Sequence, residues 1–350
     1  MASENKLKER TAWIDVCKGL CIVLVVYGHV SGGLETAGTL SAGSGWILFR
    51  SWIYLFHMPV FFALSGIFAY KLATLSVREF LLGRVRTVCF PYVVWTFIIV
   101  GAQFAMSRFV NNPPDVSRAL RFLVEPYGYG LWFLYSLLLI SVAFYFLSRL
   151  QIPRLAMILA AIVLSFLASR NVFGFWPILN SAMSFFIYYA AAACARERIV
   201  AMVSGSGWGA PLIFGAGLLL AMTGIRFAGP GEAWPLNVLL AGLGFLGMVC
   251  LAKVLAHTPA CRFWAFLGLF SLEIYLGHPL WGTVSRVVLL RSGMDSPAVM
   301  VLGGVLLGIA GSLLVGVLCR AWDFPYLFKW PVKRAAKCGR SQDPSCLPAP

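Results

Sequence analysis

The sequence predicts an all-α integral membrane protein, a polytopic bundle of about ten transmembrane helices with both termini in the cytoplasm. Of its 350 residues, 60% are hydrophobic and only 12% are charged, whereas soluble domains carry roughly 25% charged residues. The mean hydropathy is +0.84, and long apolar runs recur along the chain. These three observations exclude an ordinary soluble domain.

Ten segments reach or approach the roughly 20 apolar residues that a helix needs to cross the hydrocarbon core. The first has a basic stretch before it, but its apolar run is long and no A-x-A site follows directly. We therefore expect it to be a retained span and not a cleaved signal peptide. The fifth segment is short. In chain order the predicted spans are 13–31, 47–70, 88–107, 131–149, 155–169, 172–194, 208–227, 234–256, 263–284 and 297–319.

Lysine and arginine are distributed unevenly between the loops that this layout produces. With the N-terminus in the cytoplasm, 19 of the 28 fall on the cytoplasmic side, eight fall on the outer side, and Lys18 lies within the first span. This bias follows the positive-inside rule and favours an even number of spans. Because the net charge of +15 belongs mainly to such loops, it does not indicate nucleic-acid binding.

Three regions are expected along the chain. They are a cytoplasmic N-terminal segment (1–12), a membrane domain (13–320) and a basic, disordered cytoplasmic tail (321–350) with little apolar content. The nine cysteines, two of them in the tail, include no C-x-x-C pair. They therefore indicate neither a metal site nor a disulfide framework.

The first predicted span contains three polar groups that hydrocarbon disfavours. In "WIDVCKGLCIVLVVYGHV", Asp15 lies one turn before Lys18, and His29 follows Lys18 by 11 residues. Eleven residues are three helical turns, so Lys18 and His29 share one helix face about 16 Å apart. Such groups usually face the bundle interior or a watery cavity. The alternative is that Lys18 extends to the cytoplasmic surface and is neutralised by Asp15.

Three of the four histidines fall in the outer halves of different predicted spans. Besides His29, they are His57, which lies about two turns into the second span just before Pro59, and His278 in the ninth. Each by itself has a plain explanation as a packed core residue. As a group they suggest an imidazole that acts as a general base. A carboxylate such as Glu273, placed near mid-membrane in the ninth span, would fix its tautomer.

Two arginines begin the third predicted span on the cytoplasmic side. They are Arg84 and Arg86 in "LLGRVRTVCFPY". The positive-inside rule is one explanation for them. Guanidinium also binds phosphate in a bidentate way, so both are candidates for anchoring a phosphorylated cytoplasmic ligand.

These motifs, in this order, resemble the membrane acyltransferase-3 family of bacterial O-acyltransferases. The first-span segment is similar to the family's signature, in which a basic residue precedes the histidine by eleven positions. "FHMPVFFALSGIFAY" resembles its second-helix motif, and "GRVRTVCFPYVVW", "LWFLYSLLL" and "SLEIYLGHPL" follow in the family's order. The resemblance covers most of residues 10–320. The "D-x-x-K-G" pattern is similar to a branch that includes rhizobial acetyltransferases acting on the fucose of nodulation factors.

The resemblance implies ten spans in the bacterial inner membrane and transfer of an acyl group from acetyl-CoA, or a related acyl-CoA, to a hydroxyl of a glycan or lipid-linked oligosaccharide. The family's first-helix arginine and histidine correspond to Lys18 and His29, although lysine lacks the planar fork of arginine. We further expect His29 to act as the general base on the acceptor hydroxyl, with the donor's phosphates near Arg84 and Arg86 and its chain passing Lys18. The expected catalytic residues are His29, Lys18, Asp15, Glu273, His57 and His278. The expected cofactor contacts, with no metal, are Lys18, Arg84 and Arg86.

Two other classes of function stay open at the level of sequence. Intramembrane charges also mark transport routes, so a transporter or flippase for a glycan or lipid is the alternative. We find no inverted repeat and no paired broken helices in its favour. A non-enzymatic sensor rests only on the basic tail and its two cysteines. An enzyme would label a glycan in a reaction that requires acyl-CoA, whereas a transporter or a sensor would not.

Overall fold

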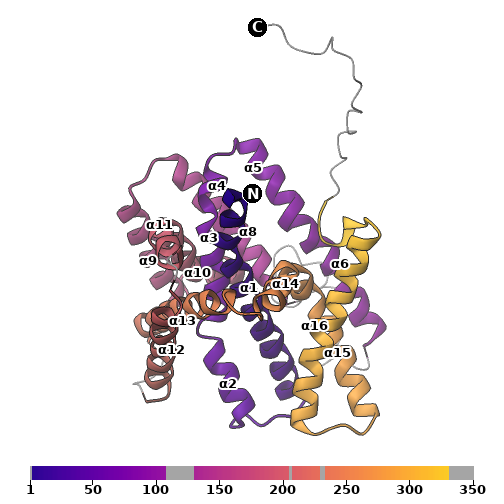
Figure 1. The fold of residues 1–350 in the computed structure, drawn as a ribbon. Coiled ribbons are helices and arrows are strands. Elements are labelled where there is room, and N and C mark those ends of the chain that lie inside the picture. Colours follow the sequence, from indigo (N-terminus) through magenta and orange to yellow (C-terminus); the bar gives the residue numbers. More distant parts are fainter. Residues whose placement is uncertain (1, 108–129, 205–206, 229–232, 331–350) are drawn as a thin grey trace, which may run out of the picture.

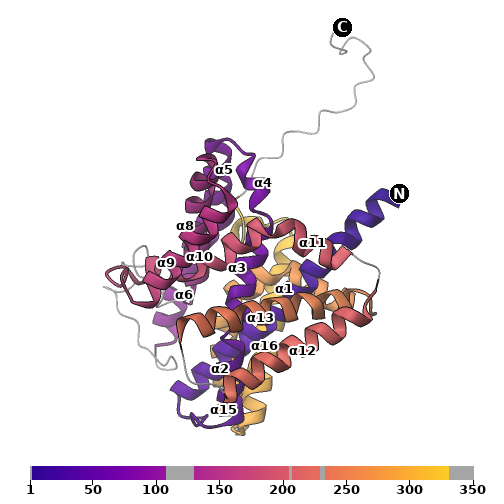
Figure 2. The same cartoon turned by 90° about the vertical axis from the view of Figure 1, so that its left-hand side faces the viewer.

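The regular elements of the protein are all helices, in a computed structural model that describes residues 2–107, 130–204, 207–228 and 233–330, with side chains from residue 12. The helices pack into a bundle (Figures 1 and 2). In chain order they are α1 (Ala2–Thr36), α2 (Gly45–Ile53), α3 (His57–Ile67), α4 (Ala69–Ala73), α5 (Val77–Arg84), the π-helix η1 (Val85–Cys89), α6 (Phe90–Ala105), α8 (Trp132–Arg149), α9 (Arg154–Ser169), α10 (Pro177–Cys194), α11 (Arg196–Ser204), α12 (Gly209–Ala228), α13 (Trp234–Ala256), α14 (Cys261–Leu269), α15 (Ser271–Arg291), α16 (Pro297–Ala321) and the 3-10 helix η3 (Pro325–Leu327).

The predicted all-α membrane fold is confirmed. Eight helical stretches within the described residues are long and apolar enough to cross a membrane. Helices α14 and α15 are joined at an angle of 75° and make a ninth crossing if the bent pair is one span. Helix α9, with 16 residues, is a shorter apolar helix at the position of the short fifth prediction. Each of the ten predicted segments therefore corresponds to a helix or a bent pair of helices.

The second predicted span is broken. Helix α2 ends at Ile53, three residues form a turn, and His57 begins α3 instead of lying inside a continuous helix. Pro59 is the third residue of α3. Because proline lacks an N–H and crowds the carbonyl four residues earlier, it disfavours continuing the helix through the preceding turn. The break at residues 54–56 therefore lies in the turn that precedes Pro59.

The third predicted span begins eleven residues earlier than expected, at Val77 instead of residue 88. Ser76 and Glu79 form a capping box, in which each side chain accepts a hydrogen bond from the other residue's backbone N–H. This cap satisfies backbone donors that the first turn leaves open. Arg84 and Arg86 consequently lie inside a continuous helical stretch, on either side of its junction with the π-helix η1.

The start of the predicted tail packs against the bundle. The indole N–H of Trp95 in α6 donates to the carbonyl of Leu327 at 2.8 Å, and the ring of Trp330 meets the ring of Phe90 edge-on at 5.0 Å. The expectation of disorder from residue 321 therefore does not hold through residue 330. The rest of the predicted tail lies outside the described residues.

Helix α1 lies inside the bundle and packs against α2, α3, α13, α14, α15 and α16. It crosses α14 at very short range, because a glycine on each helix faces the backbone of the other helix. A Cβ added to Gly19 would lie 2.0 Å from the carbonyl oxygen of Trp264, and one added to Gly268 would lie 1.8 Å from that of Asp15. Small residues at a crossing allow membrane helices to approach this closely. The crossing fixes the Asp15–Gly19 segment against α14.

The periphery of the bundle carries large exposed apolar side chains. On α12, for example, Ile213 is 76% exposed and Leu220 is 71% exposed. Lipid is as apolar as these side chains, so such a surface is stable in a bilayer and not in water. The N-terminal end of α1 and the C-terminal end of α16 point toward one end of the molecule (Figures 1 and 2). This arrangement agrees with termini on the same side of the membrane.

Candidate active site

Two histidines from distant parts of the chain meet inside the bundle. The ring centroids of His29 on α1 and His278 on α15 are 4.9 Å apart, with an interplanar angle of 57°. His278 is 1% exposed, whereas His29 is exposed. Since α1 lies against both α15 and α16, this exposed ring faces a cavity within the fold.

That cavity has a volume of about 260 Å³ and lies between α1, α6 and α15. Both histidines line it, and of the two only the ring of His29 is exposed enough to meet a small ligand there. The other lining residues are Val30, Gly33, Leu34, Ile99, Ala102, Gln103, Met106, Gly130, Pro279, Leu280, Gly282, Thr283, Ser285, Arg286 and Met300.

The tautomer of His278 follows from its hydrogen bond. Its Nδ1 lies 3.0 Å from the carbonyl oxygen of Ile274. Because a carbonyl only accepts, Nδ1 carries the proton and donates, which leaves a lone pair on Nε2. Within the described residues Nε2 is buried and has no hydrogen-bond partner. A buried polar atom left unsatisfied costs about 1–3 kcal/mol, so a site that keeps one calls for a functional explanation.

Gly130 forms the wall of the cavity beside His29. Its φ is +72°, a left-handed conformation that favours glycine. A Cβ at this position would lie 4.0 Å from Cε1 of His29. The hydroxyl of Tyr275 on α15 donates to the Gly130 carbonyl at 2.8 Å. This bond ties the segment that precedes α8 to the helix that carries His278.

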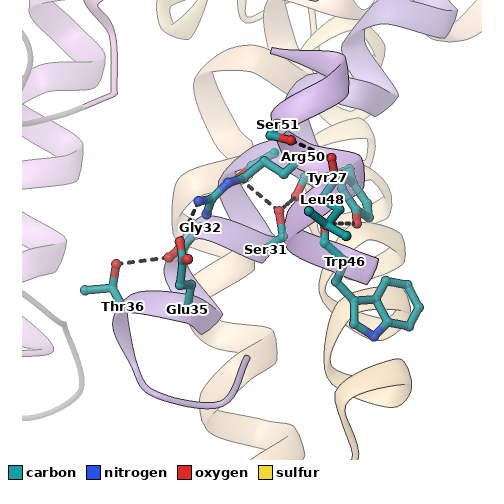
Figure 3. A network of polar contacts seen from close by, with 10 residues as sticks. Tyr27, Ser31, Gly32, Glu35, Thr36, Trp46, Leu48, Arg50 and Ser51 are labelled. Atoms are coloured by element: carbon teal, nitrogen blue, oxygen red, sulfur yellow. Dashed lines mark hydrogen bonds and ion pairs between the residues drawn. The ribbon is translucent and has the colours of Figure 1, made fainter. Parts of the chain in front are cut away.

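A polar network anchors the C-terminal turns of α1 to α2 (Figure 3). Arg50 of α2 forms an ion pair with Glu35 of α1. The hydroxyl of Tyr27 donates to the carbonyl of Trp46 at 2.7 Å. These contacts hold α2 against the last turns of α1 on both sides of His29.

His57 is the first residue of α3 and does not line the cavity. It is 6% exposed, and its Nδ1 donates to the carbonyl of Ile53 at 2.7 Å, across the break between α2 and α3. Its ring lies 5.0 Å from that of Tyr54. These contacts suit a residue that stabilises the break beside the site.

Glu273 lies in the first turn of α15, where its carboxylate pairs with Arg320 in the last turn of α16 at 2.6 Å. The carboxylate is 9% exposed, and the guanidinium of Arg320 lies over the ring of Phe270 at 3.7 Å. The sequence suggested that this acid would pair with an imidazole. In the structure it pairs with arginine, and His278 is the group beside His29.

Lys18 and Asp15 form an ion pair at 3.3 Å on α1, and both side chains are partly exposed. Neither lines the cavity. Because α1 is one continuous helix over these residues, Lys18 and His29 are about 16 Å apart along its axis, as predicted. The crossing of α1 and α14 lies at the Lys18 end of this distance.

Arg84 and Arg86 lie apart from the cavity. The guanidinium of Arg84 lies 5.7 Å from the ring centroid of Phe80. Its Nε is buried without a hydrogen-bond partner in the described part of the chain, and so is the hydroxyl of Tyr189 on α10, with which Arg84 interacts electrostatically. The backbone carbonyl of Arg86 accepts from the backbone N–H of Trp330. Arg84 Nε and the Tyr189 hydroxyl are therefore two buried polar groups whose hydrogen-bonding capacity is unused within the described residues.

A sequence model of the acyltransferase domain family matches residues 11–320. The chain belongs to this family. It is therefore a multi-pass membrane protein of the acyltransferase domain family. It is also similar to the inner membrane protein YcfT of Escherichia coli strain K12, with 27% identity over 226 residues, which covers 56% of this chain. The chain matches 59% of the length of that relative. No solved structure matches.

Two polar residues of the acyltransferase cavity were not singled out from the sequence. Gln103 is a lone amide within the apolar run "FIIVGAQFAM", a signal of the same kind as the intramembrane histidines. Arg286 was counted as an outer-loop cation, because the ninth span was predicted to end at residue 284. Helix α15 continues to Arg291 and brings Arg286 to the cavity wall.

The pairing of Glu273 leads to a prediction for the acyltransferase. The Glu273→Gln variant should transfer acyl groups within about threefold of the wild-type rate, because it removes an ion pair outside the cavity and no proton acceptor. Its thermal unfolding midpoint should fall, because Arg320 loses its partner. Both are measured on the purified protein in detergent. A loss of about a hundredfold in the transfer rate with an unchanged thermal unfolding midpoint would show that Glu273 assists the general base after all.

Proposed function

We propose that this protein transfers an acetyl or other short acyl group from acyl-CoA to a hydroxyl of a glycan or lipid-linked oligosaccharide, with His29 as the general base, in a bacterial inner membrane. The observation that carries the proposal is the exposed imidazole of His29, 4.9 Å from the imidazole of His278 in a cavity of about 260 Å³. The family match and the name of the similar inner membrane protein support the reaction class and the location.

In the proposed reaction, His29 takes the proton of the acceptor hydroxyl while the hydroxyl oxygen attacks the thioester carbonyl carbon. A tetrahedral intermediate forms, and its carbon–sulfur bond then breaks. The imidazolium of His29 returns the proton to the departing sulfur. The products are the ester and coenzyme A with a free thiol, and atoms and charge balance without a metal or a redox partner.

His278 is proposed to orient His29. Two imidazoles joined by an N–H···N hydrogen bond have ring centroids about 5 Å apart, given a nitrogen–nitrogen distance near 2.9 Å. The observed separation is 4.9 Å. The lone pair on Nε2 of His278 is therefore placed to accept the N–H of His29 after a small ring rotation. In that hydrogen bond one ring nitrogen of His29 carries the proton. The other ring nitrogen is then unprotonated and faces the acceptor hydroxyl, where it can act as the base.

The donor is proposed to bind at the cytoplasmic end, with its phosphates at Arg84 and Tyr189 and its pantetheine arm passing Lys18. The support is that Arg84 Nε and the Tyr189 hydroxyl are buried without hydrogen-bond partners in the described residues. Each offers a donor, and guanidinium binds phosphate well. Lys18 and His29 are about 16 Å apart along α1. Acyl-CoA could therefore bind from the cytoplasmic face of the membrane while its thioester reacts near His29, closer to the outer face.

This donor site leads to a kinetic prediction. Arg84→Gln should raise KM for acetyl-CoA by about tenfold or more with kcat little changed, since a charge-assisted hydrogen bond contributes roughly 1.5–3 kcal/mol. The matched control is Arg154→Gln, which removes an exposed arginine whose ion pair within the described residues is with exposed Glu197. Initial rates against acetyl-CoA concentration measure both variants. An unchanged KM in Arg84→Gln would contradict this donor site.

The proposed function is tested by mass spectrometry of cell-surface glycans and lipid-linked oligosaccharides. Cells carrying the wild-type protein, the His29→Ala variant or no protein are compared. A glycan species heavier by one acyl group, present only with the wild type, is the expected result and identifies the acceptor. If no species differs while the protein is shown to be inserted, the transporter or flippase becomes the better explanation.

A further inference from the structure

We propose that Arg196, which stacks on Tyr70, binds the 3′-phosphate of acyl-CoA, so that the protein discriminates against thioester donors that lack this phosphate. The inference rests on the proposed function, because it adds a second phosphate contact to the donor proposed at Arg84 and Tyr189. It is drawn from the surroundings of Arg196 and from its position relative to Arg84.

The guanidinium of Arg196 is held by an aromatic ring. Arg196 begins α11, and its Cζ lies 3.8 Å from the centroid of the Tyr70 ring on α4. The side chain is half-buried, and its Nε is buried with no hydrogen-bond partner among the described residues. A guanidinium that stacks on a ring uses its flat face, while its N–H groups point outward in its own plane. The contact with Tyr70 therefore explains where Arg196 lies but not what its N–H groups bind.

A second cation lies beside the same ring. The Nζ atom of Lys71 is 5.9 Å from the centroid of Tyr70. Within the described residues neither Arg196 nor Lys71 forms an ion pair, and Glu197, the acid next to Arg196 in the sequence, pairs with Arg154 at 3.4 Å. Like charges placed close together repel, and an anion between them would offset this cost. The positive-inside rule accounts for cations at this end of the protein but not for two of them on one ring.

Arg196 and Tyr70 lie close to the proposed donor site. Helices α3 and α10 cross at short range, since a Cβ added to Gly66 would lie 2.2 Å from the carbonyl oxygen of Tyr189. Tyr70 follows Gly66 by four residues, and Arg196 follows Tyr189 by seven, which is about 10 Å of helix. Arg84 interacts electrostatically with Tyr189. Both guanidinium groups therefore lie near one crossing, toward the end of the molecule where α1 begins (Figures 1 and 2).

Coenzyme A carries phosphate at two separate places on its ribose. A diphosphate joins the 5′ oxygen to the pantetheine arm, and a phosphate monoester is attached to the 3′ oxygen. We assign the diphosphate to Arg84, because the arm that follows it must enter the bundle and Tyr189 is buried there. The monoester is assigned to Arg196, beside the exposed ring of Tyr70. A phosphate monoester carries nearly two negative charges, which matches Arg196 together with Lys71, and guanidinium binds its oxygens in a bidentate geometry.

The test measures binding of coenzyme A and of 3′-dephospho-coenzyme A, which differ only in this phosphate, by isothermal titration calorimetry. The full chain is held in nanodiscs of phosphatidylcholine. The wild type is compared with Arg196→Gln, Arg196→Lys, Arg84→Gln and Arg198→Gln. Arg198 is an exposed arginine on the same helix and, in the described part of the chain, is not one of the cations beside Tyr70. It therefore controls for the loss of one positive charge.

We expect the wild type and Arg198→Gln to bind coenzyme A at least about tenfold more tightly than the dephospho form. Arg196→Gln should bring this ratio close to one and bind the dephospho form as tightly as the wild type does, which also shows that the variant is folded. Arg196→Lys keeps the charge without the planar fork and should retain part of the ratio. Arg84→Gln should weaken both ligands by the same factor, because both carry the diphosphate.

Equal binding of the two ligands by the wild type would overturn the inference, and so would a preference that survives in Arg196→Gln or disappears in Arg198→Gln. A lipid phosphate is the competing ligand for the same groups. If phosphatidylglycerol in the nanodisc abolishes the preference of the wild type and leaves binding of the dephospho form unchanged, the site belongs to the lipid. Failure of the proposed function is distinct, because then neither form of coenzyme A binds and no transfer from acetyl-CoA depends on His29.

Discussion

The His29→Ala variant is expected to lose acyl transfer by about 10²–10⁴-fold in kcat, the range that a positioned general base contributes. The effect should fall on kcat, because alanine removes the proposed proton acceptor while the proposed acyl-CoA contacts at Arg84 and Tyr189 are untouched. The exposed ring lies in a cavity, so its removal leaves the helix crossings of α1 in place. The variant should therefore insert, purify and unfold like the wild type.

The matched control for this prediction is His257→Ala. His257 follows α13, and its Nδ1 donates to the carbonyl of Lys253 at 2.8 Å, outside the cavity. We expect this variant to retain its transfer rate, measured as radiolabel moved from acetyl-CoA to the acceptor in purified membranes. Turnover like that of the wild type in His29→Ala would remove this histidine from the mechanism. An equal loss in both histidine variants would point to a structural effect.

Gly268→Val is expected to have the largest effect on folding. The added side chain would begin 1.8 Å from the carbonyl oxygen of Asp15, where backbone and not a flexible side chain blocks it. Helices α1 and α14 would have to separate, and overpacking of this kind costs about 3 kcal/mol or more. Because α1 packs against five further helices, we expect the protein to lose its monodisperse peak in detergent at a much lower temperature.

Gly217→Ala is the control for this prediction. A Cβ at Gly217, on the lipid-facing helix α12, meets nothing within 4 Å. It should keep the thermal stability of the wild type or gain slightly, because alanine favours helix over glycine. A Gly268→Val protein as stable as Gly217→Ala would show that the two helices are not packed at this distance.

The candidate site depends on two helices that are remote in sequence. His29 and His278 are 249 positions apart, and the α1–α15 packing brings their rings to 4.9 Å. The outer network of Arg50 with Glu35 and the bond from Tyr275 to Gly130 hold the two sides of the cavity. The geometry of the candidate site is therefore a property of helix packing as much as of the histidines themselves.

Some features were predictable from sequence because they depend on local chemistry. Apolar runs of about 20 residues require helices in a bilayer, so the all-α fold and nearly all segments followed from hydropathy. The 11-residue spacing of Lys18 and His29 becomes a fixed distance once the segment is helical. The capping box of Ser76 and Glu79 was also present in the sequence and would have moved the third span to its observed start.

Other features depended on which helices become neighbours. Sequence patterns give the helix face on which Glu273 lies, but not the helix that packs there. That neighbour is α16, so Glu273 meets Arg320, and His278 instead meets His29. The helices, their polar groups and the family could thus be predicted from the sequence. Which polar groups share a cavity could not, because contacts between residues far apart in the chain arise from side-chain packing and not from local periodicity.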